Sequence, residues 1–306
     1  MNRTYFGRGC RGDLVTTMQR ALSTKDYYTG KLDGQFGGGT ETAVKGLQAD
    51  RGLFASGEVD EMTWNVMTET PLPSLVERCL GLVAAFEGHG YSLVVGNFDG
   101  AWLTWGVIGF TLKHGEIQRI VLEVWAEDPQ IVSDVFGPET TALIGRFQRN
   151  DRNELRPWAD SISVGPSKVK VAEPWRTGFM QLGQSALVKQ TQLRRAVIDY
   201  FAPAQRTAHS FGLSTELGVA LAFDIHVQNG GIAAPTAQTI REAFAQVPTH
   251  DELGRRRIIA NAVAEHALPK YVEDVRKRKL TIAEGNGFVH GEAFTLARWG
   301  LGEYAS

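Results

Sequence analysis

Apolar residues recur every three or four positions along most of this chain of 306 residues. Such spacing places them on one face of a helix, so it predicts amphipathic helices. After residue 75 the main exception runs from 93 to 110, where β-branched and aromatic residues flank a turn at 97–100. We therefore expect a mainly α-helical protein with a small β-hairpin or sheet lodged in its helical part.

Charge and cysteine content exclude several classes of protein. The formal net charge is −2, so the chain has no global field for nucleic acid, and we expect neither nucleic acid nor membrane as a partner. Two basic runs, GRRRIIA and VRKRKL, are interpreted as solvated helix faces. The two cysteines, Cys10 and Cys79, do not resemble a disulfide framework. No window approaches 18 apolar residues, which argues against a membrane span.

The first 68 residues carry a dense and ordered motif. From Asp33 to Gln48 the chain reads D-G-x-F-G-x-x-T-x-x-A-V-x-x-x-Q, and G-L, G-x-V-D and T-W follow. This pattern resembles the peptidoglycan-binding domain of bacterial and phage cell-wall hydrolases. The resemblance implies a three-helix wall-anchoring module, with Asp60 near the start of its third helix. We expect this domain at 1–68, a proline-containing linker at 69–74 and a second domain at 75–306.

Two carboxylates, Glu87 and Asp99, lie in the most apolar and aromatic stretch of the chain, with no lysine or arginine nearby in sequence. A buried charge is costly unless it is paired, so their presence needs an explanation. Cleavage of a glycosidic bond uses one carboxylic acid to protonate the leaving oxygen and a second carboxylate on the other side of the sugar. Glu87 ends an apolar helix, where partial burial would keep it protonated, whereas Asp99 lies in a polar turn.

The segment FDGAWLTWGVIGFT resembles family 46 chitosanases and related phage endolysins, in the order D-G-x-x-x-T-x-G-x-I-G-F. The resemblance implies a lysozyme-like helical domain in which Asp99 is the base, Thr104 positions the attacking water and Glu87 is the general acid. Only 12 residues separate Glu87 from Asp99, fewer than we expect for a chitosanase. The shape of the cleft, and with it the substrate, is therefore left open.

A later segment, GLSTELGVALAFDIHVQNGGI, resembles the helix that lines the far wall of such a cleft. Asp224, His226 and Gln228 interrupt its apolar run and are the expected substrate-binding residues. The alternative for Asp224 is a buried structural carboxylate that pairs with an arginine from QLRRAV. None of the seven histidines has a zinc-binding spacing, so we expect no metal and no cofactor.

Together these motifs predict an endolysin-type muramidase that hydrolyses the β-1,4 bonds of bacterial peptidoglycan by acid/base catalysis with inversion. Two alternatives stay open: a chitosanase with a wall-binding module, and a non-catalytic cell-wall-binding protein. The chain begins without the apolar run of a signal peptide. We accordingly expect a monomeric bacteriophage-type antimicrobial enzyme made in the host cytoplasm that acts on the cell wall after release.

Overall fold

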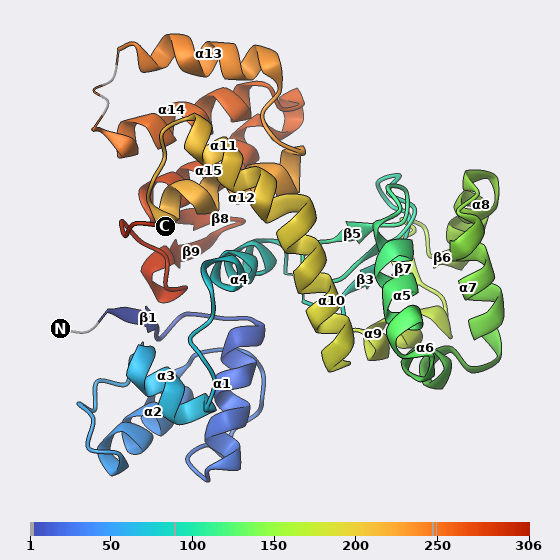
Figure 1. Ribbon diagram of the computed structural model, residues 1–306, viewed down its shortest axis with the longest axis horizontal. Coiled ribbons are helices and arrows are strands. Elements are labelled where there is room, and N and C mark those ends of the chain that lie inside the picture. The colour runs from blue at the N-terminus through green and yellow to red at the C-terminus, as the bar shows by residue number, and fades with distance from the viewer. Residues whose placement is uncertain (1–2, 89, 247, 249) are drawn as a thin grey trace. The chain divides into compact units, whose positions relative to one another are not determined.

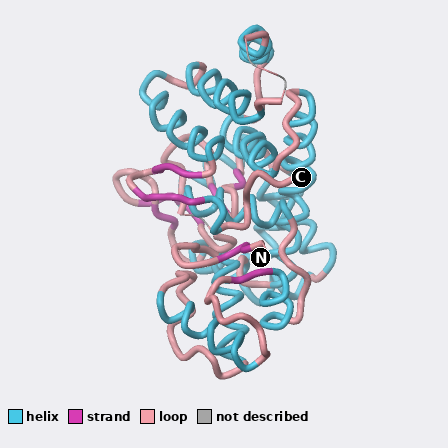
Figure 2. Tube along the Cα trace, turned by 90° about the vertical axis from the view of Figure 1, so that its left-hand side faces the viewer, coloured by secondary structure: helices cyan, strands magenta, loops and turns pink. Residues whose placement is uncertain are grey.

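The computed structural model describes residues 3–88, 90–246, 248 and 250–306, apart from the side chain of Glu87. Helices dominate, and the strands occur as short groups (Figure 2). The expected fold class, mainly α with a small sheet, is confirmed. The chain divides into two compact units, Met1–Phe86 with Asp199–Ser306, and Glu87–Ile198. Among the described residues, no helix has the length and apolar character needed to cross a bilayer.

The first unit begins with three short helices that pack together (Figure 1). Strands β1 and β2 pair antiparallel beside them, and the Asp60 side chain accepts a hydrogen bond from Thr63 N at 2.8 Å, which caps the third helix. The elements are β1 (Thr4–Phe6), α1 (Asp13–Thr24), α2 (Gly38–Asp50), β2 (Val59–Asp60) and α3 (Glu61–Thr68).

Two buried glutamines hold the loops of this segment in the same way. Gln19 Oε1 accepts a hydrogen bond from Gly34 N at 2.9 Å, and its Nε2 donates to Asp33 Oδ1 at 2.9 Å. Gln48 Oε1 accepts from Gly57 N at 2.9 Å, and its Nε2 donates to Glu58 O at 2.8 Å. These hydrogen bonds satisfy the buried glutamine side chains and tie both loops to the helices. The motif residues around Asp33 therefore build the loop.

The expected linker, 69–74, lies between α3 and α4, and Trp64 Nε1 donates to Pro71 O at 3.0 Å. The rest of the first unit is a set of helices with one C-terminal hairpin. Helix α12 is buried on nearly every side because it packs against α11, α14 and α15. The elements are α4 (Leu75–Glu87), α11 (Ala202–Ser210), α12 (Glu216–Asn229), α13 (Ala234–Phe244), α14 (Glu252–Glu265), α15 (Val272–Glu284), β8 (Asn286–Val289) and β9 (Glu292–Thr295).

The second unit places a three-stranded antiparallel sheet among helices (Figure 1). Its register pairs Thr104 with Val95 on one side and with Thr111 on the other. Trp105 is fully buried and its Nε1 donates to Phe179 O at 3.0 Å. The elements are β3 (Val94–Val95), β4 (Thr104–Trp105), β5 (Phe110–Thr111), α5 (Glu116–Glu127), α6 (Pro129–Phe136), α7 (Thr140–Arg149), α8 (Arg152–Ile162), β6 (Ser163–Val164), β7 (Lys170–Val171), α9 (Trp175–Leu182) and α10 (Ala186–Ala196).

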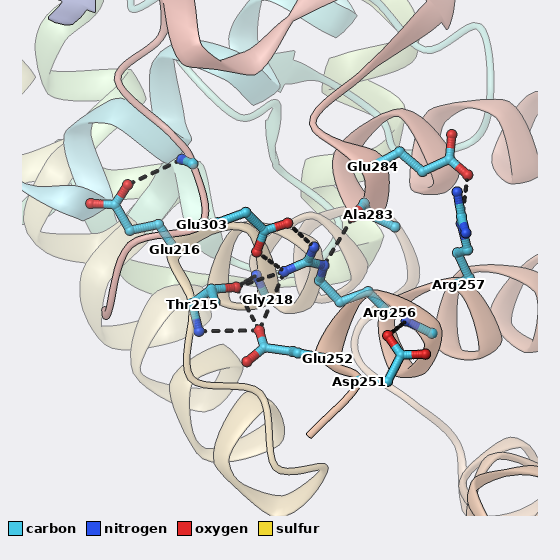
Figure 3. A network of polar contacts seen from close by, with 12 residues as sticks. Thr215, Glu216, Gly218, Asp251, Glu252, Arg256, Arg257, Ala283, Glu284 and Glu303 are labelled. Carbon is cyan, nitrogen blue, oxygen red and sulfur yellow. Dashed lines mark hydrogen bonds and ion pairs between the residues drawn. The ribbon is translucent and has the colours of Figure 1, made fainter. Parts of the chain in front are cut away.

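The interpretation of the two basic runs as solvated faces is wrong for three of their residues. Arg256, Arg278 and Lys279 are buried. Figure 3 shows the Arg256 guanidinium among the side chains of Glu303, Glu252 and Thr215; its Nη1 donates to Glu303 Oε2 at 2.8 Å. Buried cations need such partners. Two of them, Thr215 and Glu303, come from segments distant in the sequence, whereas Glu252 lies one turn earlier on the same helix.

Candidate active site

Asp99 lies on a turn that is braced from several directions. Its side chain is exposed, and Oδ1 accepts a hydrogen bond from Ala101 N at 3.0 Å. Asn97 Oδ1 accepts from Trp102 N at 2.9 Å, and Asn97 Nδ2 donates to Asp160 Oδ1 at 2.8 Å. The backbone at Trp102 has φ of 72°, a conformation that costs energy in a residue with a Cβ and is maintained by the surrounding contacts. The turn therefore presents a carboxylate to solvent in a fixed place.

Thr104 follows on β4, on the face of the sheet opposite to buried Trp105. Its side chain is half-buried. Alternation along the strand thus anchors one residue in the core and leaves the other at a surface that water can reach. This local arrangement suits a residue that holds a water molecule, the role expected for Thr104.

A third carboxylate, which sequence reasoning did not weigh, is hydrogen-bonded to the strand that pairs with Thr104. Glu116 Oε2 accepts hydrogen bonds from both N and Oγ1 of Thr111, each at 2.8 Å. Thr111 is the direct cross-strand neighbour of Thr104, and His114 Nδ1 also lies 2.8 Å from its hydroxyl. The signal was available, because Glu116 comes only five residues after Thr111, the end of the chitosanase-like segment.

Glu87 is the last residue of α4 and the first residue of the second unit. The helix buries Leu82, Val83 and Phe86 just before it. Its side chain lies outside the described part of the structure, so the acid role and the distance to Asp99 stay predictions.

Asp224 belongs to α12 in the first unit, and none of its side chain is exposed. Arg278 Nη2 donates to its Oδ1 at 2.6 Å, and Lys279 Nζ donates to Oδ2 at 2.5 Å. Burial raises the pKa of this carboxyl, but the charges of Arg278 and Lys279 outweigh burial and hold the pKa below its usual value. The geometry is that of the structural alternative, with partners from α15 instead of QLRRAV. Direct contact with a substrate would need an exposed carboxylate.

His226 and Gln228, both on α12, have side chains with different partners. His226 Nε2 lies 2.8 Å from Thr207 Oγ1 on α11, and burial, together with the nearby charge of Arg206, lowers its pKa. Gln228 is exposed and its Oε1 accepts from Lys279 Nζ at 2.6 Å. Both stay predicted substrate-binding residues. In the described residues, no group of three or more His, Cys, Asp or Glu side chains could hold a metal ion.

These features define a mainly helical protein with a three-helix N-terminal segment and a short sheet that carries an exposed aspartate. Residues 11–67 match the family described as "Putative peptidoglycan binding domain", which confirms the predicted domain at the N-terminus. A search of curated protein sequences found no significant match.

Solved structures of chitosanases are similar to this chain in fold. A chitosanase solved as a complex has a TM-score of 0.50 and 18% identity, covering 73% of this chain and 98% of the chitosanase. The GH46 chitosanase of Gynuella sunshinyii in complex with chitotetraose has a TM-score of 0.51 and 16% identity, with the same coverage of both chains. The predicted similarity to family 46 chitosanases is thereby confirmed at the level of the fold.

Proposed function

We propose that this chain is a glycoside hydrolase of the bacterial cell wall, an endolysin-type muramidase that hydrolyses β-1,4 bonds of peptidoglycan. The observation that carries the proposal is the exposed, braced carboxylate of Asp99, in a chain with a chitosanase-like fold and a peptidoglycan-binding segment. That segment supports peptidoglycan as the polymer, and the chitosanase-like fold supports glycoside hydrolysis as the reaction.

In the proposed mechanism, Glu87 donates a proton to the glycosidic oxygen as the bond to the anomeric carbon breaks. Water attacks that carbon from the opposite face, and Asp99 accepts the proton that the water loses. The Thr104 hydroxyl holds the water in line for attack. The product has inverted configuration, and we expect the two carboxyl groups to lie roughly 6.5–9.5 Å apart.

The peptidoglycan-binding segment contributes to the proposed function through local concentration. An enzyme that stays near an insoluble polymer encounters further glycosidic bonds without having to diffuse back from solution. Modest affinity of the anchoring segment therefore suffices. In the proposed biology the enzyme is made in the cytoplasm of a phage-infected host and reaches the wall after release.

A chitosanase activity is the second candidate, since both solved structures named above are chitosanases and one of them holds chitotetraose. The two candidates differ in substrate and share the acid/base chemistry. They are separated by measuring reducing ends released from purified peptidoglycan and from chitosan. Mass spectrometry of the peptidoglycan products then identifies the bond: reducing MurNAc ends indicate a muramidase, GlcNAc ends a glucosaminidase and 1,6-anhydro ends a transglycosylase.

Two variants with matched controls test the assignment of roles. Glu87→Gln is compared with Glu127→Gln, because both glutamates are the last residue of a helix. Asp99→Asn is compared with Asp151→Asn, because both aspartates are exposed and accept a hydrogen bond from the backbone N two residues later. We expect the Glu87 and Asp99 variants to lose hydrolysis and both controls to keep it. Undiminished lysis by Glu87→Gln and Asp99→Asn would remove these two residues from the catalytic assignment, whereas absence of hydrolysis by the unchanged protein would leave a non-catalytic wall-binding protein.

A further inference from the structure

Asn97 opens the turn that carries Asp99, and its side chain forms hydrogen bonds in two directions. Its Oδ1 accepts a hydrogen bond from Trp102 N at 2.9 Å, at the far end of the turn. Its Nδ2 donates to Asp160 Oδ1 on α8 at 2.8 Å. The Asn97 side chain therefore links α8 to the segment that presents Asp99 to solvent.

The carboxylate of Asp160 determines the orientation of the Asn97 amide. Hydrogen bonds from Lys168 and Asn97 hold the pKa of Asp160 below its usual value, so this carboxyl is ionised at neutral pH. An ionised carboxylate only accepts hydrogen bonds, so it requires the nitrogen of the Asn97 amide on its side. The amide oxygen then faces Trp102 N, which only donates. Lys168 Nζ donates to the same Asp160 Oδ1 at 2.9 Å and holds the carboxylate in this position.

The backbone at the start of the turn is attached to the same part of the structure. Asn97 N donates to Ser163 Oγ at 2.9 Å, and Ser163 Oγ donates to Ala159 O at 2.7 Å. Gly96 N donates to Val169 O at 2.9 Å. Because Asn97→Ala leaves these backbone contacts in place, the variant tests the side chain alone.

The far end of the turn depends on the Asn97 side chain. Trp102 has φ of 72°, which is costly for a residue with a Cβ. Between the two ends, Ala101 N donates to Asp99 Oδ1 at 3.0 Å, so the carboxylate moves with the backbone of the turn. Loss of the hydrogen bond from Trp102 N would release the costly conformation and, with it, the position of Asp99. A misplacement of about 1 Å in a catalytic group can lower a rate about 10²-fold.

We propose that Asn97 and Asp160 are positioning residues of the active site, which hold the carboxylate of Asp99 in place to accept a proton from the attacking water. Asp160 acts through Asn97, and the role requires neither residue to touch the substrate. The inference rests on the proposed function, because it takes Asp99 as the base. It extends the active site to a helical residue that lies 63 positions beyond Asn97 in the sequence.

Amide hydrogen exchange, measured by NMR on the full-length protein, tests this brace without using activity. In Asn97→Ala and in Asp160→Ala we expect the Trp102 amide to exchange at least about fivefold faster, because loss of a hydrogen bond makes local opening easier. The matched control is Glu154→Ala, since Glu154 also lies on α8, pairs with Arg149 and has a side chain 34% exposed, against 33% for Asp160. We expect the control to leave the exchange of Trp102 unchanged. Unchanged exchange in Asn97→Ala or Asp160→Ala would overturn the role of the altered residue.

Kinetics of hydrolysis test the connection to Asp99. We expect Asn97→Ala to lower kcat about tenfold with KM nearly unchanged. In a protein that already carries Asp99→Asn we expect no further loss, because residues that act through one group are not additive. Full additivity of the two losses would overturn the proposal, since Asn97 would then act elsewhere. Asp160→Asn keeps an oxygen that can accept both hydrogen bonds, so we expect it to retain most of the kcat that Asp160→Ala loses.

Further outcomes separate the brace from a general effect on the fold and from the proposed function. Equal losses of kcat in Asp160→Ala and Glu154→Ala would overturn the proposal, because any broken ion pair on α8 would then suffice. The unfolding midpoint of each variant shows whether the fold is retained. If the unchanged protein releases reducing ends from neither peptidoglycan nor chitosan, the proposed function fails, whereas the exchange of Trp102 still decides whether Asn97 holds the turn.

Discussion

Asp224 on α12 forms a buried cluster of charged side chains with Arg278 and Lys279 on α15. Replacing Asp224 by asparagine perturbs this cluster. In this cluster the Asp224 carboxylate pairs with both Arg278 and Lys279. Asp224→Asn removes the carboxylate with which both cations pair. Breaking a buried ion pair by removing one partner costs about 3–5 kcal/mol, and we expect a loss of that size in the free energy of unfolding.

Lys279→Met is the comparison that tests this reasoning. It removes one positive charge, leaves a neutral pair between Asp224 and Arg278, and fills the space with a side chain of similar length. Chemical denaturation of both variants measures the two losses. Because Asp224→Asn disrupts two ion pairs and Lys279→Met disrupts one of them, we expect the larger loss in Asp224→Asn. It is refuted if Lys279→Met costs as much or more.

The same cluster predicts how stability depends on pH. The pKa of Asp224 is lower in the folded protein than in the unfolded chain, because the nearby cations outweigh the effect of burial. Its contribution is therefore complete above the unfolded pKa of about 3.9 and is lost as pH falls below that value. Asp224→Asn should accordingly show a smaller loss of stability between pH 5 and pH 3 than the unchanged protein.

Three further outcomes are expected. Asp99→Asn should lower kcat about 10²- to 10⁴-fold with KM nearly unchanged, while Asp151→Asn keeps full activity; steady-state assays on purified peptidoglycan decide this. The pKa of His226 is lowered by burial, so stability should fall as pH drops below about 6.5, and denaturation curves of His226→Gln at pH 7 and pH 5 should differ less than those of the unchanged protein. Gly96→Ala would place a Cβ 2.4 Å from Lys168 O, a backbone atom, and should cost about 1–3 kcal/mol; a thermal midpoint equal to that of the unchanged protein would contradict this.

Local patterns were sufficient to predict the helices, the small sheet and the N-terminal domain. Helical periodicity and turn residues act over a few positions, so they can be recognised without knowledge of the tertiary fold. The turn at 97–100 was predicted for the same reason, and the structure adds a third strand, β5, to the expected hairpin. Exposure of Asp99 follows from its place in that turn.

The sequence alone did not reveal which charged side chains pair across long separations in the chain. The run VRKRKL reads as a charged, solvated segment, yet it supplies Arg278 and Lys279 to the buried Asp224, 54 and 55 residues away. Arg3 likewise pairs with Glu216, which lies 213 residues away in the sequence. Periodicity records which face of a helix is apolar. Only the packed structure decides which charges meet there, because the cost of burying each charge depends on the partner that tertiary folding brings to it.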